Sequence, residues 1–405
     1  MDIAGFQVIN EIEDGLDIDI SHSIEPRDDL QKKAFNYMLK HNNGIINLDT
    51  GAGKTVITIA AIATIKKKTL ILLHRANLVE QWIEKIETFT NMKLGKDVAI
   101  LKNNKIEKSL QKSIVISTVQ SIMSALKTRK KEIVVGLHDA KFGLMVADEI
   151  HTTIGAVSFS KCSLFIPVKR VFGLSATPER RDGTSDIMNY HLGEIYKPEG
   201  KASIMDARVT VILFNSGMFP KSEKYVYWAG KFQRSRYLNL LKKSENLNNI
   251  LTGLLEKFKL DRKVFVIVER ITFAKELCKN LKHDDKNTFI EKDKNTNLEN
   301  QIIFATPGKI RDGMDSPNTD CLITTSPVGN IKQLCGRILR IEEGKKIPII
   351  IDLVDIGCND ISKTFHWRSK FYKNKEWNVQ YILVNNGKKI IEEEEALKLI
   401  KSEEE

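Results

Sequence analysis

The sequence predicts an α/β protein with two tandem parallel-sheet domains. From about residue 44 onward, short apolar runs that suit buried strands alternate with amphipathic stretches that suit helices, an order typical of a parallel sheet with helices on both faces. The alternation stops over 181–200, where glycine, proline and charged residues recur, and it starts again near residue 208. The length of 405 residues is too great for one core and suits two or three domains of ~150 residues.

The predicted strands are short runs rich in Ile, Leu and Val. In the first domain they are Gly44–Leu48, Thr69–Leu73, Val98–Leu101, Ile114–Ser117, Gly143–Ala147 and Val171–Leu174. Amphipathic segments between them, such as Leu78–Thr90 and Val119–Leu126, are expected to be helices. In the second domain the predicted strands are Arg208–Phe214, Val264–Val268, Gln301–Ala305, Cys321–Thr325 and Ile347–Asp352.

The domain boundaries follow from this alternation and from two acidic ends. The expected parts are an acidic N-terminal segment over 1–24, a first domain over 25–200, a second domain over 201–375, and a C-terminal segment over 376–405. A linker is expected within 195–205. The stretch 392–405, which ends in an acidic tail, is expected to be helical but solvated.

The charge is unevenly distributed along the chain. The formal net charge is +11, yet residues 1–20 hold six acids and no base, and residues 391–405 hold seven acids and two bases. Removing these segments, of net −6 and −5, leaves +22 for residues 21–390. Such a basic body favours a polyanionic partner, most simply nucleic acid. The alternative is a lysine-rich composition spread over solvated faces, so charge alone does not decide the function.

Several protein classes are disfavoured by composition. No apolar run approaches the ~20 residues of a membrane span, and the start of the chain has no basic stretch followed by an apolar one, as a secretory signal would. The five cysteines lie far apart, without a paired cysteine or histidine nearby. This spacing argues against a metal cluster and a disulfide framework, and it suggests a reducing, cytoplasmic location.

A glycine-rich stretch follows the first predicted strand and leads directly into a predicted helix. It reads Asp49-Thr50-Gly51-Ala52-Gly53-Lys54-Thr55, and its glycines let backbone N–H groups and the helix N-terminus face a phosphate. Lys54 is expected to reach the β- and γ-phosphates of a nucleotide, and the Thr55 hydroxyl to ligate Mg²⁺. Leu48 stands where the full phosphate-loop pattern has glycine, so an ordinary turn is the alternative interpretation.

Two adjacent carboxylates, Asp148 and Glu149, follow the predicted buried strand Gly143–Ala147. They lie at the carboxyl end of a parallel strand, where such sheets bind ligands. Asp148 is expected to hold Mg²⁺, directly or through water, and Glu149 to position and deprotonate an attacking water. Alone, such a pair is usually a solvated strand end; together with the phosphate loop it favours a nucleotide hydrolase over a small-molecule kinase.

With these two motifs in place, the chain resembles the superfamily 2 helicases over nearly its whole length. Segments that resemble the family's other motifs occur in the family's order: Gln31, His74–Trp82, Ser117–Ser121, Ser175–Thr177, Val268–Arg270, Ala305–Pro317 and Gln333–Arg340. The resemblance implies two RecA-like domains with ATP in the cleft between them, and ATP and Mg²⁺ as cofactors. Leu48 and Asp49 depart from the family's usual first motif.

The resemblance also implies roles for individual residues. Gln31 is expected to read adenine and Asp315 to meet the ribose, while Gln333, Arg337 and Arg340 are expected to act on ATP from the second domain, where guanidinium groups suit phosphate oxygens. The residues expected to couple ATP hydrolysis to movement are His151, Ser175 and Thr177. The expected nucleic-acid contacts are Arg75, Thr118, Gln120, Arg270, Thr306 and Lys309, which would touch the backbone without reading sequence; each could instead be an ordinary surface or core residue.

The extended motif Gly173–Gly183 and the helix sequence His366–Tyr372 are similar to those of the XPB/UvsW-like branch. Within that branch, size and composition most resemble phage branch-migration DNA helicases. The resemblance thus implies an ATP-dependent DNA helicase or translocase whose partner is branched or forked DNA. It is expected to act as a monomer in replication, recombination or repair, in the host cytoplasm if viral.

Two alternatives stay open from the sequence. One is an RNA-directed or transcript-releasing helicase, and the other is a duplex-binding clamp or sensor that uses ATP only to change conformation. A strand-separating hairpin could be formed by the segment 127–132 or by the aromatic stretch 225–232, and the sequence does not distinguish them.

Overall fold

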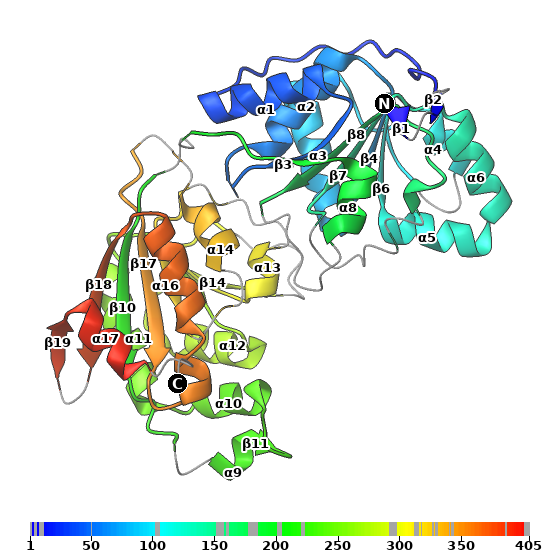
Figure 1. Ribbon diagram of the computed structural model, residues 1–405. Helices are drawn as coiled ribbons and strands as arrows, with labels where there is room; N and C mark the ends of the chain where they lie inside the picture. Colours follow the sequence, from blue (N-terminus) through cyan, green and yellow to red (C-terminus); the bar gives the residue numbers. More distant parts are fainter. Residues whose placement is uncertain are drawn as a thin grey trace. The chain divides into compact units, whose positions relative to one another are not determined.

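In the computed structural model the chain divides into two compact units, Met1–Ser203 and Ile204–Glu405, each built around one large sheet (Figure 1). The structure describes residues 2–3, 6–7, 12–49, 51–101, 106–150, 158, 162–176, 185–200, 205–219, 223–290, 298–311, 316, 318–325, 328, 331–339, 341, 344–384 and 387–400. Among these residues, no helix is both long enough and apolar enough to cross a membrane.

The sheet of the first unit has seven parallel strands. In chain order they are β3 (Asn43–Asn47), β4 (Thr69–Leu73), β5 (Val98–Ile100), β6 (Ile114–Thr118), β7 (Leu144–Asp148), β8 (Arg170–Ser175) and β9 (Ile195–Tyr196). Their order across the sheet is β5-β6-β4-β7-β8-β3-β9. The first strand, β3, therefore pairs with the last two. A separate antiparallel pair, β1 (Asp2–Ile3) and β2 (Phe6–Gln7), precedes the sheet.

Helices connect these strands, as parallel neighbours require. They are α1 (Asp29–Lys40), α2 (Lys54–Ile65), α3 (Asn77–Phe89), α4 (Ile106–Leu110), α5 (Val119–Thr128), α6 (Lys130–Asp139) and α8 (Ser185–Leu192). Side-chain caps begin two of them: the Asp28 side chain accepts from the Gln31 N–H at the start of α1, and Thr118 accepts from the Ser121 N–H at the start of α5. Such caps satisfy amides that the helix leaves unpaired.

The sheet of the second unit has eight strands, all parallel except the last pair. They are β10 (Arg208–Phe214), β13 (Val264–Ile267), β14 (Lys286–Phe289), β15 (Ile302–Ala305), β16 (Cys321–Thr324), β17 (Ile349–Asp355), β18 (Asn378–Val384) and β19 (Lys388–Ile391). The order is β14-β15-β13-β16-β17-β10-β18-β19. The first strand again pairs with late ones, because β10 lies between β17 and β18.

The second unit also holds a small hairpin and nine helices among its described residues. The hairpin pairs β11 (Tyr227–Trp228) with β12 (Lys231–Phe232). The helices are α9 (Glu223–Val226), α10 (Arg234–Leu241), α11 (Glu245–Phe258), α12 (Ile271–Asn280), α13 (Pro307–Arg311), α14 (Ile331–Ile338), α15 (Asn359–Ser362), α16 (Phe365–Asn374) and α17 (Glu393–Leu399).

Each sheet is buried on both faces. Along β4, Ile71 and Leu73 join the core on one side of the sheet, and Leu70 and Leu72 join the core on the other. This alternation explains why β4 reads as a continuous apolar run rather than as an alternating one. The predicted α/β class with parallel sheets is confirmed, and the predicted strands 69–73 and 208–214 match β4 and β10.

The acidic segment before α1 packs on the first unit. Ile20 and Ile24 are buried in its core, and the Asp14 carboxylate pairs with Lys67 at 3.0 Å and with Arg170 at 2.5 Å. Hydrogen bonds to Arg170 and Lys67 hold the pKa of Asp14 well below its ordinary value of 3.8. This segment therefore fastens the edge of the sheet where β4 and β8 begin.

Replacing Asp14 with asparagine is expected to lower the free energy of unfolding by about 1 kcal/mol at neutral pH, because its ion pairs are partly solvent-exposed. The folded-state pKa is depressed, so this stabilisation is present above pH 3.8 and is lost as the pH falls toward the folded value. Calorimetric unfolding from pH 7 to pH 3 should show the gap between wild type and Asp14→Asn narrowing below about pH 4. Asp19→Asn, at an exposed position nearby, is the control; an equal loss there would contradict the assignment.

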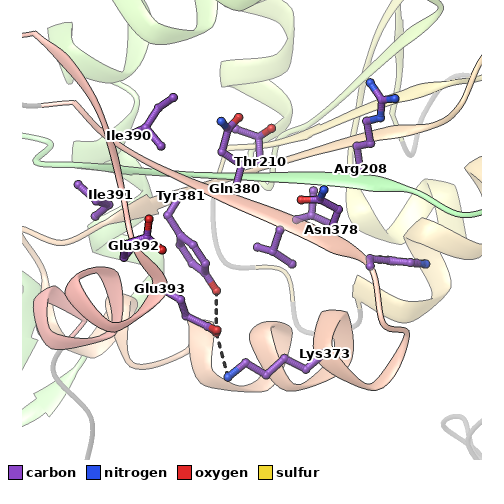
Figure 2. A pocket seen from close by; sticks show the side chains of 13 residues that line it. Arg208, Thr210, Lys373, Asn378, Gln380, Tyr381, Ile390, Ile391, Glu392 and Glu393 are labelled. Carbon is purple, nitrogen blue, oxygen red and sulfur yellow. Dashed lines mark hydrogen bonds and ion pairs between the residues drawn. The ribbon is translucent and has the colours of Figure 1, made fainter.

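The acidic end of the second unit departs from expectation. The helix was predicted and is present as α17, but it is not fully solvated: Ala396 and Ile400 are buried in the core, because one apolar side of a helix can pack although its other side is acidic. Figure 2 shows Glu393 accepting a hydrogen bond from the Tyr381 hydroxyl at 3.2 Å and pairing with Lys373 at 2.9 Å. These contacts lie in a hollow of about 660 Å³ beside β10 and β18. Residues 401–405 lie outside the described part.

A buried polar network holds α16 to the sheet. Asp352 of β17 and Arg368 of α16 are both buried, with the guanidinium Nε 2.7 Å from the carboxylate Oδ2. The Tyr372 hydroxyl donates to the same oxygen at 2.9 Å, and the Thr324 hydroxyl donates to Oδ1 at 3.1 Å. The helix sequence that resembles the XPB/UvsW-like branch thus has a structural task here: its Arg and Tyr, one turn apart, grip one aspartate.

Candidate functional site

The glycine-rich loop joins β3 to α2 and is supported from α1. Gly51 and Gly53 have φ angles of +85° and +80°, a region that favours glycine. The Gln31 amide donates to the Ala52 carbonyl at 3.0 Å and accepts from the Arg27 N–H at 2.8 Å. A Cβ on Gly53 would lie 2.4 Å from Gln31 Nε2. Gln31 therefore braces the loop, a role that sequence reasoning did not foresee, and its predicted contact with adenine stays a prediction.

Lys54, the first residue of α2, is buried, and its Nζ donates to the carbonyl oxygens of Leu48 and Asp49 at 2.9 and 3.2 Å. The cation therefore lies inside the curled loop rather than in solvent. A phosphate group bound in this loop would offer charged oxygens in place of neutral carbonyls, and charge-assisted bonds are about twice as strong. The loop geometry therefore fits a nucleotide phosphate chain, and Thr55 follows directly on the helix.

Asp148 ends β7 and is buried. Its Oδ2 accepts a hydrogen bond from the indole Nε1 of Trp82, on α3, at 2.9 Å, and its Oδ1 accepts from the Glu149 N–H at 2.9 Å. Burial, and next the negative charge of Glu149, raises the pKa of Asp148 to about 6, against the favourable charge of Lys54. A buried carboxylate that is destabilised in this way is a suitable ligand for a divalent cation, which would favour its ionised form.

Glu149 has a φ of +52°, in the left-handed region that residues other than glycine seldom occupy. Such backbone is held only where the surroundings enforce it, and it is concentrated at functional sites. The Ile150 N–H bonds to the Leu174 carbonyl at 3.3 Å, which ties the next residue to β8. The strained position turns the chain away from β7 directly after Asp148, at the edge where the loop also lies.

Ser175 ends β8, the strand between β7 and β3, and is fully buried. Its carbonyl accepts from the Leu48 N–H at 3.2 Å, and its neighbour Leu174 pairs in register with Asp148. Ser175 thus stands between the glycine-rich loop and the two carboxylates. This placement suits the coupling role that we expect for it.

The remaining candidates of the first unit lie along the same edge of the sheet. Arg75 follows β4 and Thr118 ends β6, so the order β6-β4-β7-β8-β3 separates them from the glycine-rich loop. Thr118 is occupied as the cap of α5, and Gln120 on that helix is exposed. One edge therefore carries the expected strand contacts on one side and the expected nucleotide groups on the other.

The second unit brings three further candidates to the carboxyl ends of two adjacent strands. Arg270 follows β13, Thr306 follows β15, and these strands are paired. The Arg270 Nη2 donates to the Ser235 carbonyl at 2.7 Å. The buried Thr306 hydroxyl has no hydrogen-bond partner among the described residues. Lys309 on α13 lies 5.1 Å from the centre of the Phe289 ring.

The other predicted site residues are not described, or are described only as backbone. Thr50, His151, Thr177, Asp315 and Arg340 lie outside the described residues, and the side chains of Gln333 and Arg337 on α14 do too. The segment 127–132, one candidate for a hairpin, is instead the junction of α5 and α6, where Arg129 and Glu132 pair at 3.3 Å. That expectation was wrong, because the segment holds the end of one helix and the start of the next, separated by Arg129, and no strand.

Comparison with known proteins finds similarity to a restriction-enzyme family and to helicases. Residues 9–180 match the protein family described as Type III restriction enzyme, res subunit. A protein of Acanthamoeba polyphaga mimivirus, provisionally named an ATP-dependent RNA helicase, is 27% identical over 87% of this chain and 68% of its own length. A provisionally named helicase of Escherichia phage T5 is 23% identical over 82% of this chain and 72% of its own. The DNA 3′-5′ translocase XPB2 of Sulfurisphaera tokodaii is 34% identical over 44% of this chain and 36% of its own.

Solved structures share the fold at low sequence identity. The helicase domain of Hef from Pyrococcus furiosus has a TM-score of 0.55 and 15% identity, covering 84% of this chain and 97% of that one. The DNA-bound Type ISP restriction-modification enzyme LlaBIII has a TM-score of 0.59 and 15% identity over 93% of this chain and 32% of its own. Both units of the present chain are accordingly RecA-like.

Proposed function

We propose that this chain, which belongs to the XPB/UvsW-like branch of the superfamily 2 helicases, is an ATP-dependent DNA translocase that remodels branched or forked DNA. The enzyme class, a helicase-type ATPase, follows from the family. The observation that carries the proposal is the carboxyl edge of the first sheet, where Lys54, Asp148 and Glu149 are presented by neighbouring elements.

The hydrolytic step assigned to this edge uses the chain's own groups. Lys54 holds the β- and γ-phosphates of ATP in the curled loop. Glu149 takes a proton from the attacking water as the water oxygen bonds to the γ-phosphorus, and the bond to the bridging oxygen breaks to release ADP. Thr55 and Asp148 would hold Mg²⁺, which when bound neutralises phosphate charge. The oxygen-rich donor set and the buried carboxylate fit that ion.

The second unit completes the proposed cycle. Arg337 and Arg340 are proposed to contact the γ-phosphate when ATP is bound between the domains, with Gln333 beside them and Asp315 at the ribose. Arginine suits this place because its planar guanidinium binds two phosphate oxygens at once. Closing on ATP and opening after hydrolysis would move the two backbone-binding edges in turn along a strand, with Ser175, Thr177 and His151 linking the two events.

The choice of DNA rests on three supports. Residues 21–390 carry a large positive charge, one relative is named a DNA translocase, and the motifs resemble those of branch-migration enzymes. An RNA substrate is the second candidate, favoured by the name of the mimivirus relative. A clamp without turnover is less well supported, because Glu149, the proposed water-activating group, directly follows Asp148 at a backbone position with a φ of +52°.

The test is steady-state ATP hydrolysis with a four-way DNA junction, a simple fork, linear duplex, single strands and RNA as activators, followed by unwinding of the junction and the fork. We expect the junction to stimulate hydrolysis most and to be unwound by the enzyme. Equal stimulation by RNA would favour the second candidate. No stimulation by any nucleic acid would overturn the proposal.

Trp82→Phe is expected to weaken the apparent affinity for Mg²⁺ by about 10-fold, because groups that orient a ligand typically contribute that much. Phenylalanine keeps the packing of α3 but cannot donate to Asp148. The measurements are the Mg²⁺ dependence of ATP hydrolysis and the thermal stabilisation by Mg²⁺ with ADP. Saturating Mg²⁺ should restore turnover, and Trp367→Phe, at an exposed position, should change neither. An unchanged Mg²⁺ dependence would show that Trp82 only fills the core.

A further inference from the structure

The hairpin β11–β12 combines an anchored base with an exposed tip. At the base, the Tyr227 and Phe232 rings meet edge to face at 5.7 Å, and the Tyr227 hydroxyl donates to Asp360. At the tip, Ala229 and Gly230 both have positive φ, +48° and +72°, which suits a two-residue turn between antiparallel strands. The hairpin is therefore tied to the unit, and its tip has a defined shape.

Two aromatic rings at this hairpin face solvent instead of the core. Trp228 is 66% exposed and Tyr225 is 49% exposed. The Arg236 guanidinium of α10 lies over both, 5.3 Å from the Trp228 ring centre and 5.5 Å from that of Tyr225. Its Nη1 also donates to the Tyr225 carbonyl at 3.1 Å. The two exposed rings therefore lie beside the positive charge of Arg236.

The segment 224–243, which contains the hairpin and α10, is basic, with Glu223 directly before it. Residues 224–243 contain six lysines and arginines and no acid. An ordinary solvated surface instead mixes positive and negative side chains. Figure 1 places α9 and β11 beside α10. Charge of one sign next to exposed rings matches a polyanion that also presents flat apolar faces, and single-stranded nucleic acid has both.

The hairpin is also linked to a predicted strand contact. The Arg234 guanidinium, at the start of α10, pairs with the Glu269 carboxylate, with Nε 3.2 Å from Oε2. The next residue, Arg270, donates to Ser235 on the same helix. The segment after β13, which contains the expected nucleic-acid contact Arg270, is therefore bonded directly to the helix that carries Arg236.

We propose that Trp228, Tyr225 and Arg236 form a stacking site for an unpaired base of the DNA strand that passes the second unit. The site rests on the proposed function, which it deepens by adding a grip on single-stranded substrate. Backbone phosphates would meet the neighbouring basic side chains, such as Lys231, while one base lies against the Trp228 ring. Because every base has a π-face, this grip carries no sequence preference.

The test compares binding of a fluorescently labelled single strand of about 20 thymidines with that of a blunt duplex, using the full chain without ATP. Trp228→Ala is expected to weaken single-strand binding by about 5- to 100-fold, the range typical of one stacked base, and to leave duplex binding within about twofold. Trp228→Phe should retain most of the affinity for the single strand. Binding of the strand should quench tryptophan emission in the wild type but not in Trp228→Phe. Arg236→Gln should weaken both modes less than Trp228→Ala weakens the single-strand mode.

Trp367→Ala is the matched control, because Trp367 is 72% exposed in the same unit but lies outside the basic segment. Basal hydrolysis without DNA should be unchanged in every variant. Unaltered single-strand binding by Trp228→Ala, or self-association that this change abolishes, would overturn the stacking site. If no nucleic acid stimulates wild-type hydrolysis, the proposed function itself fails. If stimulation is intact and Trp228→Ala binds normally, only the stacking site fails.

Discussion

Lys54→Ala is expected to reduce ATP turnover at least ~10²–10³-fold, the loss seen when one preorganised donor to a developing charge is removed. The ammonium lies within the curled loop, donating to the Leu48 and Asp49 carbonyls, so a phosphate chain in the loop meets it directly. We expect the fold to remain intact, because the Lys54 side chain lies in the loop and not in the hydrophobic core. Steady-state hydrolysis with and without DNA measures the first effect, and thermal unfolding measures the second.

Lys66→Gln provides the comparison, since Lys66 is an exposed lysine at the opposite end of α2. It should hydrolyse ATP normally. Turnover in Lys54→Ala within a few-fold of wild type, in protein that melts normally, would mean that the loop binds no nucleotide. Loss of turnover accompanied by unfolding would instead assign Lys54 a structural role.

The second large effect is on stability. Arg368→Ala is expected to lower the free energy of unfolding of the second unit by about 3–5 kcal/mol, because it leaves the buried Asp352 carboxylate without its cation. The Tyr372 and Thr324 hydroxyls still donate to Asp352, which keeps the loss at the lower end of that range. Trp82 is the one tryptophan of residues 1–203, so in a Trp82→Phe background the fluorescence of denaturant unfolding reports the second unit alone.

Two further variants separate the charge from the packing. Lys370→Ala removes an exposed cation from the same helix and should change the unfolding free energy by less than about 0.5 kcal/mol. The pair Asp352→Leu with Arg368→Met removes both charges and should recover much of the loss. If the pair is as unstable as Arg368→Ala, packing rather than the buried charge accounts for the effect.

Much of the architecture could be predicted because a buried parallel strand can be recognised from its own short stretch of sequence. Runs such as 69–73 are apolar on both faces of a sheet, so their sequence alone marks them. The same regularity brings the glycine-rich loop and the pair Asp148-Glu149 to one edge, since carboxyl ends of parallel strands share an edge. The strand pairing β7-β8-β3 then sets Ser175 between them.

What could not be predicted depends on contacts between residues that are distant in sequence. The hydrogen bond from Trp82 to Asp148 joins residues 66 apart; Trp82 lies in a segment singled out for its motif, but nothing local shows where its indole points. The loop brace by Gln31 is of the same kind. Charge counting suggested a solvated acidic end, yet the two apolar residues on one side of α17, Ala396 and Ile400, decide its packing.

The placement of the first strand in each sheet has a consequence for how the chain is made. On the ribosome, β3 emerges long before β8 and β9, and β10 long before β17 and β18, the strands that flank them. The earliest strand of each sheet therefore has no neighbouring strand to pair with until almost all of its unit has been synthesised. Since the first unit ends at residue 203, it can complete its sheet while the second unit is still being translated. The periods in which β3 and β10 are unpaired therefore follow one another and do not overlap.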